Sequence, residues 1–323
     1  MSYIYSSKLK SYIEGLIEQK NAVGCPYRTC ARILKIFDIF CNRYYPNEAL
    51  MTREIALHWA QKRPKEHINN LIRRITPIRQ LAKYMNSIGE NAFVIPGGIP
   101  GKGIRYIPHI YTHQELQAFF VETDKIPYHP NCPAKHLVIP VLFRVLYCCG
   151  LRSSEVRKLK VIDFDLRIGK LIIRKSKGDK DRTVMISKDL LRLCRIYNEK
   201  VSLIFPNRQW FFPNHRGDHY CKSFLDTVFN LLWEKTGIII SCGSPPRVHD
   251  FRHSFAVKRL NLWVKNNLDL NVYLPYLSMY LGHAHLTETD YYLRLVPEFY
   301  PVFIEKTAGK CNNLIPKVNT DET

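Results

Sequence analysis

Residues 247–292 carry the side chains of this chain that are best suited to chemistry on a phosphodiester. The segment begins RVHDFRHSFAVKRL and ends LGHAHLTETDYY. In a helix that starts near Val248, His249 and Arg252 are three positions apart and share one face. Arginine and histidine can neutralise and hydrogen-bond a phosphate, and a tyrosine hydroxyl can attack its phosphorus. The segment therefore predicts a phosphoryl-transfer site, and its other candidate residues are His283, Tyr291 and Tyr292.

The charge of the whole chain agrees with a polyanionic partner. The 323 residues include 48 Lys+Arg against 28 Asp+Glu, which gives a net charge of +20 and a pI near 9.5. Residues 1–100 hold 15 basic and 7 acidic residues, a net of +8, so the excess is spread over the chain. Such an excess favours nucleic acid or an anionic membrane as a partner. The simpler alternative is a generally basic protein with solvated lysines.

Several other classes of protein are disfavoured. The longest apolar stretch, HLVIPVLFRVLYCC, contains Arg144 and is too short to span a bilayer. The first residues, MSYIYSSKLKSYIEG, lack the apolar core of a signal peptide. Ten cysteines without such a signal indicate reduced thiols. The chain contains no CxxC pair of the kind that would suggest a zinc site. We therefore expect a cytoplasmic protein with no membrane contact, no metal site and no cofactor.

Two domains are expected, mainly α-helical with a small β-sheet. Residues 1–92 show helical periodicity and several basic positions, with Thr52 as a cap for the third of four helices. Residues 93–111 contain three prolines and four glycines, which predicts a linker. A second domain over 112–300 begins with a capping box, Thr-His-Gln-Glu. Residues 301–323 form a C-terminal tail.

The second domain combines helices with one hairpin. A helix over about 135–149 is expected to end at Gly150. The runs LIIR and RTVMI flank a polar turn that contains Lys177 and Lys180, which predicts a β-hairpin with lysines at its tip. Further helices are expected at about 188–200, 217–236, 249–265, 271–281 and 287–295.

Four motifs follow one another in a recognisable order: GLRSSEVRKL, the hairpin SKGDKDR, HDFRHSFA and LGHAHLTETDYY. This order resembles the tyrosine recombinase (phage integrase) family over about residues 146–296. The N-terminal helices are similar in kind to the family's helical, SAM-like core-binding domain. The resemblance implies that the two domains form a clamp on DNA.

The resemblance also implies a catalytic set. Arg152 and Arg252 correspond to the two phosphate-binding arginines. Lys177 corresponds to the hairpin lysine, with Lys180 as its competitor. The family nucleophile usually lies nine residues after the histidine of LGH, which favours Tyr292 over Tyr291, although the double tyrosine departs from the family pattern. The whole implied set is Arg152, Lys177, His249, Arg252, His283 and the nucleophile Tyr292, with Glu155 in support.

Three neighbouring side chains have simpler structural interpretations. Glu155 is expected to pair with a cation such as Arg152 and to orient it, without taking part in the chemistry. His253 is expected to be buried and hydrogen-bonded. His285 is interpreted as an accidental neighbour of His283.

The resemblance implies a site-specific DNA recombinase of the integrase or transposase type. Strands would be cut and rejoined through a 3′-phosphotyrosyl intermediate, without ATP or metal, with Lys177 as general acid. The implied partners are double-stranded DNA, a homo-tetramer on paired DNA sites and a DNA-bending accessory protein, in a bacterial, DNA-associated setting. The tail would either be exchanged between protomers or pack onto its own domain. The alternatives are an enzyme like a type IB topoisomerase and a catalytically silent DNA-binding accessory factor.

Overall fold

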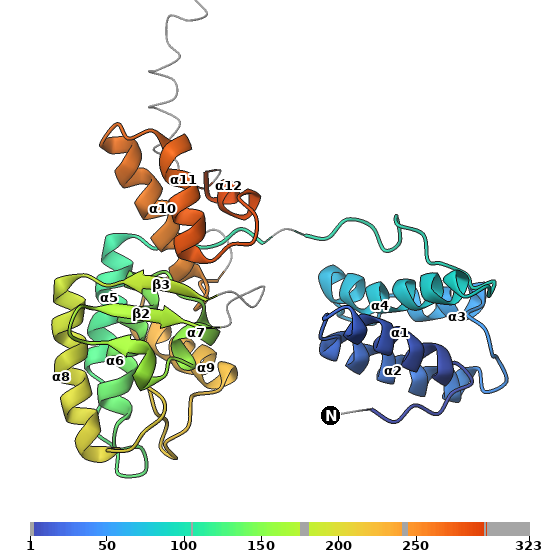
Figure 1. Ribbon diagram of the computed structural model, residues 1–323, viewed down its shortest axis with the longest axis horizontal. Coiled ribbons are helices and arrows are strands. Elements are labelled where there is room, and N and C mark those ends of the chain that lie inside the picture. The colour runs from blue at the N-terminus through green and yellow to red at the C-terminus, as the bar shows by residue number, and fades with distance from the viewer. Residues whose placement is uncertain (1–2, 105, 175–180, 241–244, 294, 296–323) are drawn as a thin grey trace, which may run out of the picture. The chain divides into compact units, whose positions relative to one another are not determined.

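The chain folds into two units, Met1–Tyr106 and Ile107–Thr323. The computed structural model describes residues 3–104, 106–174, 181–240, 245–293 and 295 (Figure 1). Most of these residues are helical, and one small sheet accompanies the helices, so the expected fold class is confirmed. Across the described ranges, no helix combines the length and the apolar character needed to cross a bilayer.

The N-terminal unit consists of four helices around one core. In α2, apolar side chains recur at helical spacing, and Phe37 packs edge-on against Trp59 of α3 with ring centroids 5.0 Å apart. Thr52 caps α3, as predicted, by accepting a hydrogen bond from the amide of Ile55. The helices are α1 (Lys10–Ala22), α2 (Arg28–Tyr44), α3 (Arg53–Ala60) and α4 (Ile68–Ser87).

The two ends of the predicted linker, residues 93–111, pack onto the units that they join. Ile95 is buried in the N-terminal core, and its carbonyl accepts a hydrogen bond from Arg79 at 2.8 Å. At the other end, the amide of Tyr111 donates to the hydroxyl of Ser254 at 2.9 Å, inside the second unit. The segment also contacts the N-terminal unit farther along, because the backbone of Ile104 both donates to and accepts from the side chain of Asn69.

The second unit contains the remaining helices and the sheet. The predicted capping box is present, since Thr112 and Glu115 bond each other's backbone at the start of α5. The expected helix start at residue 217 is wrong: Gly217 has φ +81°, and Cys221 caps a helix that begins later. The helices are α5 (His113–Asp124), α6 (Lys135–Cys148), α7 (Ser153–Arg157), the 3₁₀ turn η1 (Val161–Asp163), α8 (Lys188–Ile204), α9 (Lys222–Lys235), α10 (Asp250–Lys265), α11 (Leu270–Leu281) and α12 (Thr287–Leu293).

The sheet has three antiparallel strands in the order β1-β2-β3. The strands are β1 (Phe164–Asp165), β2 (Lys170–Ile173) and β3 (Arg182–Met185). Leu171 pairs with Val184, both fully buried, so the register of the β2–β3 hairpin places this apolar pair on the core face. The predicted hairpin is thus confirmed, while its tip at 175–180, with Lys177 and Lys180, lies outside the described residues.

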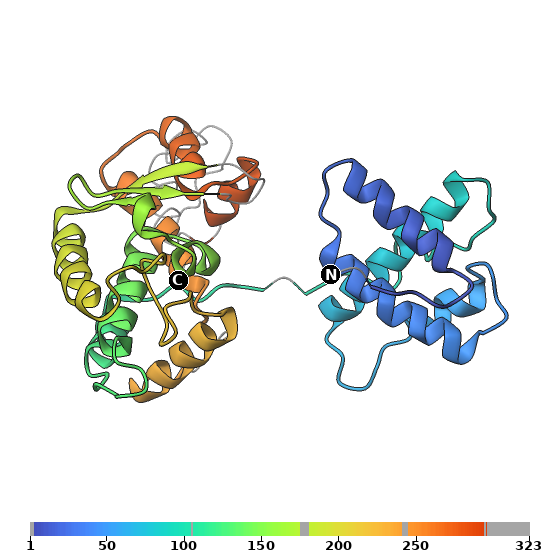
Figure 2. The same ribbon diagram turned by 60° about the horizontal axis from the view of Figure 1, so that its bottom comes forward.

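Two cores hold this unit together. The larger core contains Phe119, Phe143, Phe229 and Phe251, which join α5, α6, α9 and the start of α10. A smaller core includes Tyr292 and is built by α10, α11 and α12, which lie together at one end of the unit (Figures 1 and 2). The position of Tyr292 therefore depends on how these three helices pack.

Two glycines turn the chain at the ends of helices. Gly150, after α6, has φ +57°, and Gly282, after α11, has φ +66°. Residues with a Cβ avoid this left-handed conformation. At Gly150 a Cβ would also lie 2.5 Å from Phe255. Both turns lead directly to predicted site residues, Arg152 and His283.

Candidate active site

The two predicted phosphate-binding arginines are held by backbone carbonyl groups. The Nη1 of Arg252 donates to the carbonyl of Gly150 at 2.8 Å, and its Nη2 donates to the carbonyl of Leu281 at 2.5 Å. The Nη2 of Arg152 donates to the carbonyl of Gly282 at 2.9 Å. Only 2% of Arg252 is exposed, and burial, followed by the charge of Arg152, lowers the pKa of Arg252 to about 10. Two guanidiniums are thereby concentrated beside the end of α11.

Tyr292 lies beside this pair of arginines. It is 3% exposed, and the charge of Arg252 acts on its hydroxyl. Burial raises the pKa of Tyr292, and the charge and hydrogen bond of Arg252 partly oppose that rise. Tyr291 is less buried, and its ring centroid lies 6.0 Å from that of Tyr292. Of the two tyrosines, Tyr292 is the more buried and the one whose pKa the charge of Arg252 lowers against the effect of burial.

Two histidines, His253 and His283, pack against the ring of Tyr292, and His249 packs against His253. His283 stacks on the ring of Tyr292 with a centroid distance of 5.9 Å, and its Nδ1 lies 2.7 Å from the hydroxyl of Thr289. His249, at the N-cap of α10, lies with its ring 4.9 Å from that of His253. Removal of the ring from water and then the charge of Arg252 lower the pKa of His249 to about 4, although the residue as a whole is exposed. His249 is therefore neutral at pH 7.

His253 only partly follows its prediction. It is largely buried, and its ring contacts those of His249 and Tyr292. Its buried Nδ1, however, has no hydrogen-bond partner within the described part of the chain, so the expectation of a hydrogen-bonded histidine fails at this atom. The reason is that α10 places the imidazole among aromatic rings. Burial, ahead of the charges nearby, lowers the pKa of His253 to about 3.

Glu155 pairs with Arg152, as expected. Its carboxylate accepts from the side chain and the backbone amide of Arg152, each at 2.8 Å. The carboxylate also accepts two hydrogen bonds from Arg182, at 2.8 and 2.7 Å. Of the predicted set, the structure thus gathers Arg152, Glu155, His249, Arg252, His283 and Tyr292, whereas Lys177 lies outside the described residues.

Arg182 is the residue of this cluster that the sequence analysis missed. It opens β3 and shares a strand face with the fully buried Val184, two residues later. A charged side chain on the inward face of a strand was the signal that could have revealed it, because such a group needs a buried partner.

The sequence pattern of the phage integrase family matches residues 111–298, which is more than half of the chain and includes all of the described cluster. The chain belongs to the phage integrase family of tyrosine recombinases. Its relatives include the candidate integrase/recombinase y4rE of Sinorhizobium fredii, 31% identical over 87% of this chain and 90% of that protein. The protein is therefore an enzyme of site-specific recombination.

Two solved structures share the fold of this recombinase. XerH site-specific recombinase, in a post-cleavage complex with its palindromic difH substrate, aligns with a TM-score of 0.65 and 20% identity over 94% of this chain and 85% of that one. The lambda integrase tetramer bound to a Holliday junction aligns with a TM-score of 0.59 and 15% identity over 88% of this chain and 76% of that one. At these identities the likeness concerns the fold.

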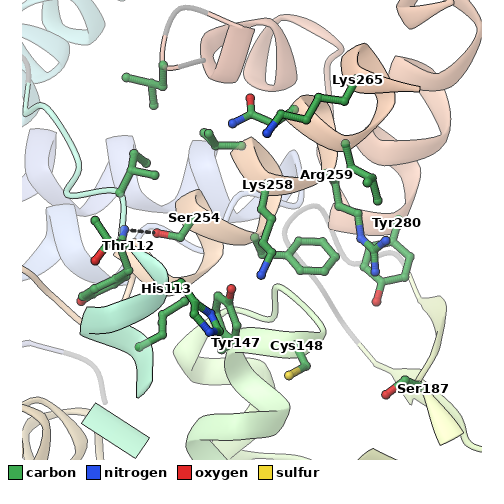
Figure 3. A pocket seen from close by; sticks show the side chains of 18 of the residues that line it. Thr112, His113, Tyr147, Cys148, Ser187, Ser254, Lys258, Arg259, Lys265 and Tyr280 are labelled. Atoms are coloured by element: carbon green, nitrogen blue, oxygen red, sulfur yellow. Dashed lines mark hydrogen bonds between the residues drawn. The ribbon is translucent and has the colours of Figure 1, made fainter. Parts of the chain in front are cut away.

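The recombinase also contains a cavity of about 910 Å³ that is distinct from the cluster (Figure 3). Lys258 and Arg259 of α10, Tyr280 of α11 and Cys148 of α6 contribute to its wall. None of the predicted site residues that the structure describes lines it. The size of a cavity is thus a poor guide to the candidate site here, which is better located by its convergent charged groups.

Proposed function

We propose that this recombinase cuts and rejoins DNA strands with Tyr292 as its nucleophile, as an integrase or transposase of a mobile element. The observation that carries the proposal is that Tyr292 is buried beside the guanidinium of Arg252, whose charge favours ionisation of the phenol, with its ring 5.9 Å from that of His283. Arg152 contributes a second positive charge to the same tyrosine. A phosphate bound by these arginines would lie within reach of the phenolic oxygen.

The proposed step is a transesterification. The Tyr292 oxygen forms a bond to phosphorus as the bond from phosphorus to the 5′ oxygen breaks, which gives a 3′-phosphotyrosyl link and a free 5′ hydroxyl. The phenolic proton passes to a histidine of the cluster. Lys177 gives a proton to the leaving oxygen, a role assigned from the sequence because this residue lies outside the described ones. The link conserves bond energy, so a second strand can be joined without ATP.

The arginines supply most of the electrostatic stabilisation in this scheme. The transition state spreads negative charge over the non-bridging oxygens, and planar guanidiniums can meet these oxygens with paired hydrogen bonds. Donors that are fixed before the reaction avoid reorganisation, and each contributes roughly 3 kcal/mol. The carbonyl contacts of Arg152 and Arg252 provide such fixation.

The proposed partner is double-stranded DNA, bound by a helical unit over residues 1–92 and a catalytic unit over 112–300. Support comes from the net charge of +20 and from XerH, whose structure contains its difH substrate. A tetramer on paired sites, as in the lambda integrase structure, and a DNA-bending accessory protein complete the proposal. The proposed exchange of the tail, 301–323, concerns residues outside the described ones. DNA affinity should fall steeply as salt concentration rises.

Trapping of the covalent intermediate tests the chemistry. A nicked suicide oligonucleotide that carries the target site should leave a protein–DNA adduct with the wild type and none with Tyr292→Phe. Tyr291→Phe is the matched control, because it removes a neighbouring hydroxyl from the same helix, and it should still form the adduct. An adduct that is lost only with Tyr291→Phe would show that the nucleophile is assigned wrongly.

The same preparation separates the alternatives. An accessory factor without catalytic activity would bind the oligonucleotide and form no adduct. An enzyme like a type IB topoisomerase would relax supercoiled plasmid that lacks the target site. The proposed recombinase should form the adduct and should exchange strands between two target sites.

A further inference from the structure

The C-terminal end of α11 is a meeting point for three arginines. The carbonyl groups of residues 280, 281 and 282 accept hydrogen bonds from Arg182, Arg252 and Arg152, in that order, at 2.8, 2.5 and 2.9 Å. The last carbonyls of a helix lack partners within the helix and carry partial negative charge. The end of α11 is therefore a natural anchor for three guanidiniums, and it leads directly into His283.

Arg182 differs from the other two arginines in where its donors point. Its Nε contacts the α11 carbonyl, while its Nη1 and Nη2 both donate to the carboxylate of Glu155, at 2.8 and 2.7 Å. The side chains of Arg182 and Glu155 are only 9% and 6% exposed. All three side-chain nitrogens of Arg182 thus bond protein groups, so this arginine is placed to hold other residues.

Glu155 lies between Arg182 and Arg152 and binds both. Burial by itself raises the pKa of Glu155, but the hydrogen bonds and charge of Arg182, followed by those of Arg152, lower it to about 2. The carboxylate is thus ionised at neutral pH and separates two cations that would otherwise repel each other. Losing Arg182 would leave Glu155 with one arginine and would remove the fork that fixes the plane of its carboxylate.

We propose that Arg182 is a positioning residue of the cleavage reaction. It fixes Glu155, which in turn fixes the guanidinium of Arg152, and its contact with the carbonyl of Tyr280 ties both to the helix end before His283. The inference rests on the proposed function, in which Arg152 binds the scissile phosphate. Arg182 itself touches no reacting atom.

Kinetics of single-turnover adduct formation on the nicked oligonucleotide test this role. Arg182→Gln should slow adduct formation on the order of 10²-fold through misplacement of Arg152, with DNA affinity unchanged within about 2-fold. Arg182→Lys should also be slow, because an ammonium cannot reproduce a two-pronged contact with a carboxylate.

Arg208→Gln is the matched control. Arg208 is another partly buried arginine of the same unit, bound to the side chains of Asn198 and Ser202. If Arg182 acted only through stability, the two glutamine variants would lower the urea midpoint and the adduct yield in parallel. The expected result is instead a slow rate confined to Arg182→Gln, measured where all variants are folded.

A double-mutant cycle shows whether Arg182 acts through Glu155. The variant with both Arg182→Gln and Glu155→Gln should be no slower than the slower single variant, because both changes break the same link. Two results would overturn the inference, provided that the wild type forms the adduct. One is a double variant whose loss of rate is the product of the two single losses, and the other is an Arg182→Gln rate equal to that of Arg208→Gln. A wild type that forms none overturns the proposed function and this inference together.

Discussion

Replacing Glu155 with glutamine should strongly destabilise the catalytic unit, although the two side chains differ in only one heavy atom. The substitution keeps the size of the side chain but removes the charge that binds Arg152 and Arg182. Both arginines then face a neutral amide in a site that is largely closed to water. The substitution removes one partner of a buried ion pair. The main source of the lost stability is then the buried arginines that keep their charge without a carboxylate to balance it.

The magnitude follows from the pKa of the carboxyl group. A glutamate whose pKa falls from 4.5 to about 2 on folding contributes about 3 kcal/mol to the free energy of unfolding at neutral pH. This contribution is complete above pH 4.5 and is lost as the pH falls toward 2, where the native carboxyl also takes up a proton. The difference in the free energy of unfolding between wild type and Glu155→Gln should therefore be largest near pH 7 and should decrease below pH 4.5.

Urea unfolding followed by tryptophan fluorescence measures this gap. Three of the four tryptophans lie in the catalytic unit, so fluorescence reports mainly on its unfolding. Asp124→Asn is the matched control, because Asp124 also pairs with an arginine, Arg144, at 2.6 Å but is 54% exposed. Loss of such an exposed pair should cost less than about 1 kcal/mol. The tryptophans of the catalytic unit are Trp210, Trp233 and Trp263.

Two results would contradict this reasoning. A gap below about 1 kcal/mol at pH 7 would mean that the carboxylate is not the buried, doubly paired group described above. A large gap that stays constant from pH 7 to below pH 4.5 would mean that its source is packing and not charge.

Three further predictions concern residues around the site. Thr289→Val removes the hydroxyl beside the Nδ1 of His283 and should slow adduct formation roughly 10- to 100-fold at unchanged DNA affinity. Gly150→Ala forces a Cβ into left-handed backbone and against Phe255, so urea titration should show a loss of at least about 1–2 kcal/mol. Burial lowers the pKa of His253 from 6.5 to about 3. At pH values between these two pKa values, the imidazole therefore takes up a proton when the protein unfolds. The urea midpoint should fall as the pH falls below 6.5, because this group lowers the free energy of unfolding by up to about 1.4 kcal/mol per pH unit. The midpoint of His253→Phe should fall less steeply over the same pH range.

Each of these predictions has an outcome that contradicts it. A wild-type rate for Thr289→Val would show that His283 does not depend on the threonine hydroxyl. Gly97→Ala is the control for Gly150→Ala, since a Cβ at Gly97 meets open space, and equal losses would exclude the proposed clash. An identical pH slope for His253→Phe and wild type would show that this histidine is not held neutral by folding.

The sequence predicted the elements whose signals are local. The capping box at Thr112 and the apolar runs of the hairpin depend on residues within a few positions of one another, and the structure contains both. The order of the motifs indicated the family, which the match over residues 111–298 shows. Short-range patterns and motif order were sufficient for these features.

Features that depend on distant contacts were not accessible in this way. The partners of Arg182 lie 27 and 98 positions away in the chain, and no periodicity connects them. The orphan Nδ1 of His253 likewise depends on which rings of α12 pack against α10. In both cases the packing of separate helices and strands decides the environment of the side chain.

The anchoring of three guanidiniums on main-chain carbonyls affects how far related sequences can diverge. A carbonyl group is the same whatever side chain follows it, so the identity of residues 280 and 281 matters for packing and not for holding the arginines. Only position 282 is restricted by the backbone, because its φ of +66° favours glycine. Recombinases that differ widely along this helix could therefore keep the same arrangement of charge, and variants randomised at 280 and 281 could be screened for new packing without dismantling it.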